Sequence, residues 1–151
     1  MAQGIFYVLD GLDDDQQLSL FCDQIAQRWR EQRSVRVWCR DQLQAEQLDE
    51  ALWQQPVDAF VPHNIYGEGP PQGAPVEICW AGNDAPARRT AVVVNLMDEL
   101  PPLQGVRLII DRVPSAETER QQARERYKSY RSQRIELQTI NAAELTSNSE
   151  K

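Results

Sequence analysis

Short apolar runs that alternate with amphipathic segments restrict the fold of this chain more than any other feature of its sequence. Ile5–Leu9 is apolar and partly β-branched, and Val35–Cys39 is apolar except for Arg36, so each predicts a buried strand. Between them, apolar residues recur every three or four positions from Leu18 to Trp29, which predicts an amphipathic helix. Asp41 is a suitable N-cap for a second helix. This order of strand, helix, strand and helix is typical of parallel βαβ units.

The second half of the chain adds three expected strands and one long helix. They are Val76–Trp80, Ala91–Val94, Val106–Ile110 and the helix Ala116–Arg134. A chain of 151 residues is the usual size of one domain. We therefore expect a single α/β domain over residues 1–140, followed by a polar, disordered tail at residues 141–151.

The segment between the second helix and the third strand is rich in turn-forming residues. Residues 54–75 hold five prolines and three glycines with apolar side chains between them, which predicts an ordered loop or a crossover. Trp53 and Phe60 lie beside or within it. Such aromatic groups either fold back onto the core or stay exposed as anchors of a protein interface. The sequence leaves both alternatives open.

The chain is acidic, with a formal net charge of −7, but this charge is unevenly distributed. Residues 112–134 carry seven basic and three acidic side chains, which gives a local charge of +4 and leaves −11 for the remainder. A negative net charge argues against general binding of nucleic acid, because that affinity depends on neutralising phosphates. The location of the basic segment is therefore more informative about binding partners than the net charge of the whole chain.

Most basic side chains of the last expected helix fall on one face. At 100° per residue, Arg120, Arg124, Lys128 and Arg131 lie within an arc of about 100°, with Tyr127 beside them. A solvated basic face would give the same pattern. One sign of charge clustered in an acidic protein, next to an aromatic ring, instead favours a site for an acidic peptide. Direct binding of single-stranded DNA is a further alternative, but a stacking platform needs more aromatic groups.

No sequence motif indicates catalysis or nucleotide binding. After the first strand, Asp10–Asp15 contains one glycine among four acids, where a dinucleotide site requires G-x-G-x-x-G. These acids either hold Mg²⁺ in a metal-dependent hydrolase or, as we favour, provide a cap at Asp13 or Asp14 for the following helix. His63 is the only histidine, and the three scattered cysteines are expected to be buried. We expect no catalytic residue, no metal and no cofactor.

The sequence shows no targeting or membrane signal. No apolar run approaches the roughly 20 residues of a membrane-spanning helix. The N-terminus lacks the basic start and apolar stretch of a signal peptide. We therefore expect a cytoplasmic protein without membrane contact.

Several blocks of the sequence resemble the chi subunit of the bacterial DNA polymerase III holoenzyme. They are Leu48–Trp53, Phe60–Asn64, Gly67–Pro70, Gly73–Ile78 and Ala123–Arg131, with weaker similarity at Phe6–Asp10. The resemblance covers residues 4–135. It implies a single three-layer, Rossmann-like α/β domain with a mostly parallel, mixed sheet and no nucleotide-binding glycine loop.

The resemblance also implies a non-catalytic adaptor in DNA replication. Chi proteins pair with the psi subunit, which ties them to the clamp-loader complex, and some pair with a helicase through the same surface. They also bind the acidic C-terminal tail of single-stranded-DNA-binding protein, whose last residue is phenylalanine. Two protein partners, and no direct contact with nucleic acid, are therefore expected.

Residues of this chain are assigned to both contacts by the same resemblance. The tail site would comprise Val113, Arg120, Arg124, Tyr127, Lys128 and Arg131. Arg124 and Lys128 would hold the tail's carboxylates, and Val113 and Tyr127 would line a pocket for its terminal phenyl ring. The psi or helicase surface would include Trp53, Phe60 and Pro62.

Overall fold

The computed structural model describes residues 2–55, 60–69, 74–83, 85–86 and 88–149. Its helices and strands are β1 (Gln3–Val8), α1 (Asp14–Gln32), β2 (Val35–Cys39), α2 (Gln42–Gln54), β3 (His63–Ile65), β4 (Val76–Trp80), β5 (Val92–Asn95), β6 (Leu108–Val113), α3 (Glu117–Ser132), β7 (Glu136–Asn141) and α4 (Ala142–Ser149). Strands β2 and β4 have the predicted bounds, and the other predicted elements differ by a few residues at their ends. No helix in the described ranges is both long and apolar enough to cross a membrane.

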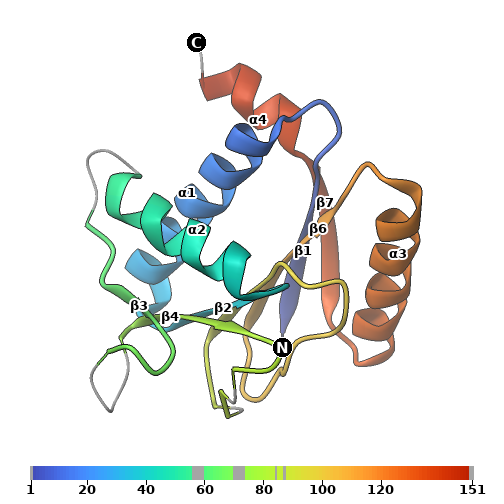
Figure 1. Cartoon of the computed structure of the whole chain (residues 1–151). Helices are drawn as coiled ribbons and strands as arrows, with labels where there is room; N and C mark the ends of the chain where they lie inside the picture. Colours follow the sequence, from blue (N-terminus) through green and yellow to red (C-terminus); the bar gives the residue numbers. More distant parts are fainter. Residues whose placement is uncertain (1, 56–59, 70–73, 84, 87, 150–151) are drawn as a thin grey trace.

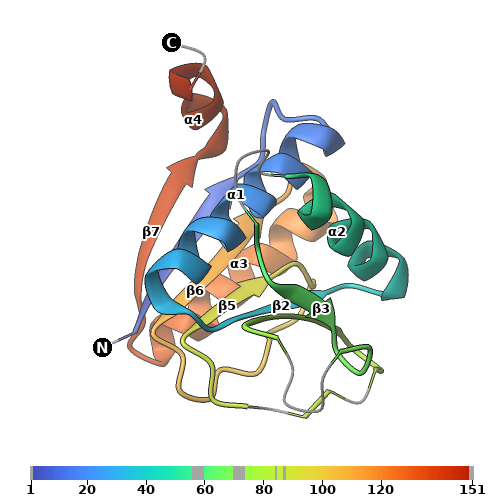
Figure 2. The ribbon, with the colours of Figure 1, turned by 90° about the vertical axis from the view of Figure 1, so that its left-hand side faces the viewer.

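The described strands form one sheet in the order β3-β4-β2-β5-β6-β1-β7. Every neighbouring pair runs parallel, so the prediction of a mixed sheet is wrong in that detail. Parallel sheets are normally covered on both faces. Figure 1 shows α1 and α2 on one face and α3 on the other, and Figure 2 shows these layers after a quarter turn. The predicted three-layer α/β architecture is therefore confirmed.

Side chains of the strands alternate between two apolar layers. Val37 and Ile110 pack in the layer beneath α1 and α2, together with Ile25 of α1. On the other face, Phe6 packs with Tyr130 of α3. Because these strands are buried on both sides, their sequences read as continuous apolar runs, and this is why the sequence located them.

Both helices of the first layer begin at aspartate caps. Asp13 accepts a hydrogen bond from the backbone N–H of Gln16 at 2.8 Å, and the Gln16 side chain accepts one from the N–H of Asp13 at 2.9 Å. This is a capping box. Asp41 accepts from the backbone N–H of Gln44 at 2.9 Å. The predicted capping of both helices by aspartate is confirmed.

Two segments hold regular structure that the sequence did not predict. Strand β3 lies in the Pro-rich segment, of which residues 56–59 and 70–73 are outside the described part of the chain. Strand β7 pairs with β1 and leads into α4, where a disordered tail was expected from residue 141. Residues 150–151 of that expected tail also lie outside the described part. The sheet thus gains a parallel strand at each edge.

Candidate functional site

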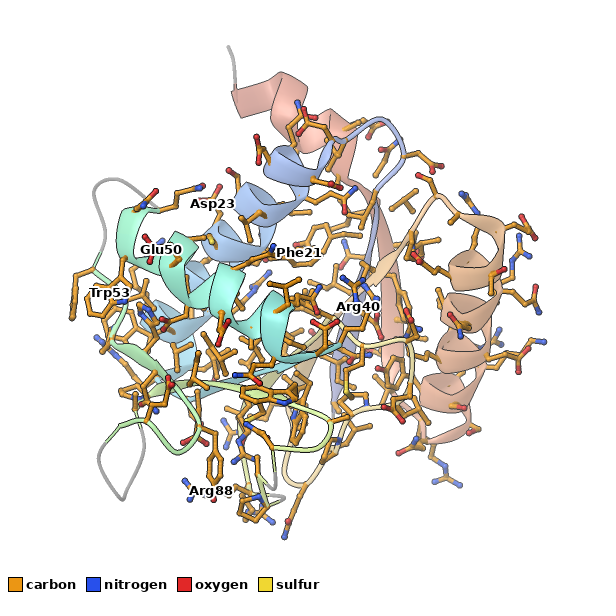
Figure 3. All side chains as sticks on the ribbon, in the orientation of Figure 1. Phe21, Asp23, Arg40, Glu50, Trp53 and Arg88 are labelled. Carbon is orange, nitrogen blue, oxygen red and sulfur yellow. The ribbon has the colours of Figure 1, made fainter. Side chains whose placement is uncertain are left out.

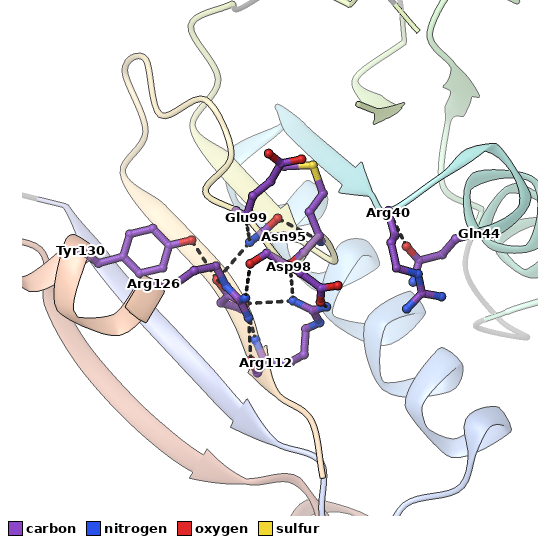
Figure 4. Close-up of polar contacts among 10 residues, drawn as sticks. Arg40, Gln44, Asn95, Asp98, Glu99, Arg112, Arg126 and Tyr130 are labelled. Atoms are coloured by element: carbon purple, nitrogen blue, oxygen red, sulfur yellow. Dashed lines mark hydrogen bonds and ion pairs between the residues drawn. The ribbon is translucent and has the colours of Figure 1, made fainter. Parts of the chain in front are cut away.

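Helix α3 is fixed to the sheet by a buried ion pair, which Figure 4 shows. Arg126 has only 2% of its surface exposed. It donates from Nε and Nη2 to the two carboxylate oxygens of Asp111 on β6, at 3.0 and 3.1 Å. The hydroxyl of Tyr130 donates to the same carboxylate at 2.8 Å. These contacts fix the rotation of α3 about its axis, so the opposite face of the helix must point to solvent.

Asp111 compensates a second buried cation besides Arg126. Arg112 is buried and places Nη1 3.5 Å from Asp111, while its Nη2 donates to Asp98 at 3.1 Å. Burial lowers the pKa of Arg112 and, together with the Asp111 carboxylate, raises the pKa of Tyr130. Two of the seven basic residues counted in the sequence are therefore internal. Arg126 anchors the helix, Arg112 pairs with Asp98 and Asp111, and neither belongs to the exposed surface of α3.

The four cations of the predicted stripe lie on the outward face of α3. Arg124, Lys128 and Arg131 are exposed, and Arg120 is half-buried. Arg124 lies 3.9 Å from Glu117, and Lys128 lies 3.5 Å from Glu125. Exposed pairs of this kind contribute at most about 1 kcal/mol, because water and salt screen them. These two cations therefore remain able to pair with carboxylates of a ligand.

Apolar surface adjoins the cationic stripe. Val113, at the end of β6, and Tyr127 of α3 are both half-buried and pack against the apolar cluster under the helix. The Tyr127 ring lies 5.3 Å from the Phe6 ring, centroid to centroid. Tyr130 is fully buried, which removes it from the stacking groups on which direct binding of single-stranded DNA would depend. The arrangement suits one phenyl ring held beside several carboxylates.

Arg120 has a partner that the sequence did not indicate. Its Nη1 donates to Oδ1 and Oδ2 of Asp10 at 3.2 and 3.3 Å, and its Nη2 donates to Oδ2 at 3.3 Å. The hydroxyl of Ser115 donates to Asp10 Oδ1 at 2.7 Å. The Ser115 hydrogen bond, followed by those of Arg120, lowers the pKa of the Asp10 carboxyl. Asp10 therefore serves as an anion partner at the start of α3.

The acids considered for a metal-dependent hydrolase have other roles in the structure. Asp10 is paired with Arg120, and Asp13 caps α1. Over the described ranges, no group of three or more His, Cys, Asp or Glu side chains is arranged to hold a metal ion. The contacts of Asp10 and Asp13 favour the capping interpretation over the metal interpretation.

A second candidate surface lies where α2 ends and the Pro-rich segment returns toward the sheet. Trp53 and Phe60 are 61% and 69% exposed, and their ring centroids lie 6.2 Å apart. Pro62 is half-buried nearby in sequence, whereas Val61 is buried. Of the two alternatives left open, exposure therefore holds for these two aromatic rings. An exposed aromatic pair is typical of a protein interface.

His63 supports this aromatic pair from inside. Its ring lies 4.8 Å from that of Trp53, and its side chain is fully buried. The Nδ1 atom lies 2.7 Å from the carbonyl oxygen of Val61, and Nε2 lies 3.2 Å from that of Asp49. Nε2 is also 3.3 Å from the Asp49 carboxylate. These contacts hold the imidazole against Trp53, so His63 has a structural role beneath the exposed aromatic pair.

The two surfaces lie on different sides of the molecule. Figure 3 labels Trp53 at the outer end of α2, and α3 lies across the sheet from it. Strand β3, next to the Trp53 side, is at one edge of the sheet, whereas α3 packs on β6 and β7 toward the other edge. A partner at one surface would therefore leave the other uncovered.

Sequence reasoning missed three acids that organise these surfaces, namely Asp10, Asp49 and Asp111. One signal was available for Asp111, because the pair Asp111–Arg112 directly follows an apolar strand run. A charged residue in a buried strand requires a partner of opposite charge. For Asp10 and Asp49, the partners are distant in the sequence, at Arg120 and His63, and local patterns do not reveal them.

Comparison with known proteins gives a consistent result. A family model described as "DNA polymerase III chi subunit, HolC" matches residues 1–138. The DNA polymerase III subunit chi of Escherichia coli (strain K12) is 40% identical over 145 residues, covering 92% of this chain and 97% of that protein. Its counterpart from Haemophilus influenzae is 40% identical over 121 residues (80% and 83% covered), and that from Pseudomonas aeruginosa is 29% identical over 139 residues (91% and 95% covered). This chain belongs to the DNA polymerase III chi subunit family.

Proposed function

We propose that this protein is a non-catalytic adaptor of the replicative DNA polymerase. It would link the clamp-loader complex, through a psi subunit, to the acidic C-terminal tail of single-stranded-DNA-binding protein. The observation that carries the proposal is the cationic outer face of α3, which adjoins half-buried apolar groups and is held in place by the buried Arg126–Asp111 pair. As a replication subunit, the protein would act in the cytoplasm.

At the tail site, charge and apolar surface would act on different parts of one peptide. Arg124 and Lys128 would pair with carboxylates of the tail, and Arg131 would extend the same field along the helix. The terminal phenyl ring would rest against Val113 and Tyr127, which are half-buried and already packed on the apolar cluster. Because α3 is anchored before the peptide arrives, little conformational entropy would be lost on binding.

The exposed rings of Trp53 and Phe60 would form the contact with psi, or with a helicase that uses the same surface. Aromatic side chains that are largely exposed in the free protein gain the most from burial in a complex. The buried His63 ring behind Trp53 would keep that side chain oriented. Partners at this surface would exclude one another, whereas the tail could bind at the same time on the other side.

The proposal is tested by reversing one charge on α3. We expect Arg124→Glu to weaken binding of an acidic tail peptide at least about tenfold, because a charge-assisted hydrogen bond is replaced by repulsion. Arg107→Glu is the matched control, since Arg107 is exposed and directly precedes β6, whose far end carries Val113. Equal peptide affinity for wild type and Arg124→Glu would remove the tail site.

A further inference from the structure

The guanidinium of Arg120 is already occupied by a carboxylate of the same chain. Both Nη atoms donate to Asp10, with distances of 3.2 to 3.3 Å. Asp10 lies just beyond the end of β1, and Arg120 lies in the first turns of α3. Ser115 holds the Asp10 carboxylate in position with a hydrogen bond of 2.7 Å. The contact therefore joins the first strand to the helix of the stripe.

A carboxylate that engages both Nη atoms of an arginine uses the same donors that a peptide carboxylate would use. The end-on position across the two Nη atoms of Arg120 is open to a peptide carboxylate only after Asp10 leaves it. We propose that Asp10 is an internal competitor of the acidic peptide at Arg120, so that it lowers the affinity of the stripe and sets which acidic peptides bind. This inference rests on the proposed tail site and names the residue that tunes it.

The contacts of Asp10 differ from those of the other acids beside the cationic stripe. Glu117 and Glu125 belong to α3 itself and approach Arg124 and Lys128 through single contacts of 3.9 and 3.5 Å. Their side chains are also mostly exposed, so solvent and salt screen them. Asp10 lies in the turn after β1 and accepts three hydrogen bonds from Arg120.

Exchange of this internal pair is feasible because it is partly solvated. The side chains of Arg120 and Asp10 keep 30% and 49% of their exposure, so neither charge becomes fully desolvated when the pair opens. A partly exposed ion pair of this kind corresponds to an affinity change of up to about fivefold. Asp10 should therefore reduce tail affinity without abolishing it.

The test compares two substitutions that remove one negative charge each. Asp10→Asn removes the competitor, and Asp14→Asn is the matched control, since Asp14 is exposed in the first turn of α1 and borders the same hollow as Ser115. Each full-length variant is titrated calorimetrically with an acidic peptide ending in phenylalanine. We expect Asp10→Asn to bind about two- to fivefold more tightly than wild type, and Asp14→Asn to change affinity much less. Combined with Arg120→Gln, Asp10→Asn should give no gain.

The possible outcomes separate this inference from the proposed function. If wild type binds the peptide but Asp10→Asn binds equally or more weakly, Asp10 is not a competitor and the tail site stands. If Asp14→Asn gains as much as Asp10→Asn, the effect is one of net charge, and direct competition is overturned. If neither wild type nor Asp10→Asn binds, the tail site and the inference both fall.

Discussion

Replacing Asp111 by asparagine should be among the most destabilising changes of similar size in this protein. The side chain keeps its shape, but the carboxylate that faces two buried arginines loses its charge. Arg126 lies 3.0 Å and Arg112 lies 3.5 Å from this carboxylate. Among the described residues, the ion pair left to these two arginines would be that of Arg112 with Asp98, which is one third exposed. Removal of one partner of a buried ion pair costs about 3 to 5 kcal/mol.

The magnitude can be compared with the stability of a domain of this size. Unfolding free energies are typically about 5 to 15 kcal/mol, so the loss would be about a fifth of the total or more. For 151 residues, each kcal/mol lowers Tm by about 2 to 4 °C, which predicts a decrease of about 6 to 20 °C. Urea denaturation measures the free energy, and scanning calorimetry measures Tm.

Two further variants make the result specific to the buried pair. Asp98→Asn removes a charge that is one third exposed and should cost no more than about 1 kcal/mol. The double variant Asp111→Asn with Arg126→Gln should lose less than the sum of the two single losses, because the second change removes a cation that the first leaves unpaired. A loss for Asp111→Asn that is no larger than that of Asp98→Asn would refute the buried network as the anchor of α3.

Other predictions follow from the same contacts. Trp53→Ala should lower the unfolding free energy, measured in urea, by less than about 1 kcal/mol, but it should weaken binding of a psi subunit more than about tenfold. Leu43 is exposed on the same helix, so Leu43→Ala is the control and should change neither the stability nor the binding. Carbon-detected NMR titration should show the pKa of the Asp10 carboxyl below its usual 3.8, and Arg120→Gln should raise that pKa toward 3.8. Because the folded-state pKa is lowered, the contribution of this carboxylate to folding stability is present above pH 3.8 and is lost as the pH falls through the lowered pKa. An unshifted pKa would exclude the pair of Asp10 with Arg120 in solution. Burial raises the pKa of Cys22, Cys39 and Cys79 to about 12. The native protein at pH 8 should therefore react slowly with a thiol reagent that modifies all three cysteines in denaturant. Fast reaction of the native protein would contradict the observed packing.

The sequence predicted the elements that form from a local pattern of residues, and it missed those that depend on pairing with distant residues. Val35–Cys39 and Val76–Trp80 were found with correct bounds, because four of the five residues in each are apolar, as is typical of buried parallel strands. Strand β7 was missed because Glu136–Asn141 is a mostly polar edge strand, formed by its pairing with β1. The end of β6 was also missed, since Asp111 and Arg112 read as a strand terminus unless their buried partners are known.

The candidate sites show the same division. Helical spacing alone placed Arg120, Arg124, Lys128 and Arg131 on one face, because the position of a side chain around a helix depends on sequence separation. The exposure of Trp53 and Phe60 could not be predicted, since the last turn of a helix and the loop after it can each direct an aromatic ring inward or outward. The pairing of Arg120 with Asp10 joins residues that lie 110 positions apart, which no local pattern records.

The central claim, that the outer face of α3 binds an acidic tail, is tested most directly by calorimetric titration with a short acidic peptide ending in Asp-Ile-Pro-Phe. The titration is performed at low and at moderate salt, with a peptide that lacks the final phenylalanine as the control. We expect micromolar binding that weakens with salt, because Arg124 and Lys128 are exposed, and that disappears without the phenyl ring. Absence of binding at both salt concentrations, or equal binding of the peptide without phenylalanine, would contradict the account.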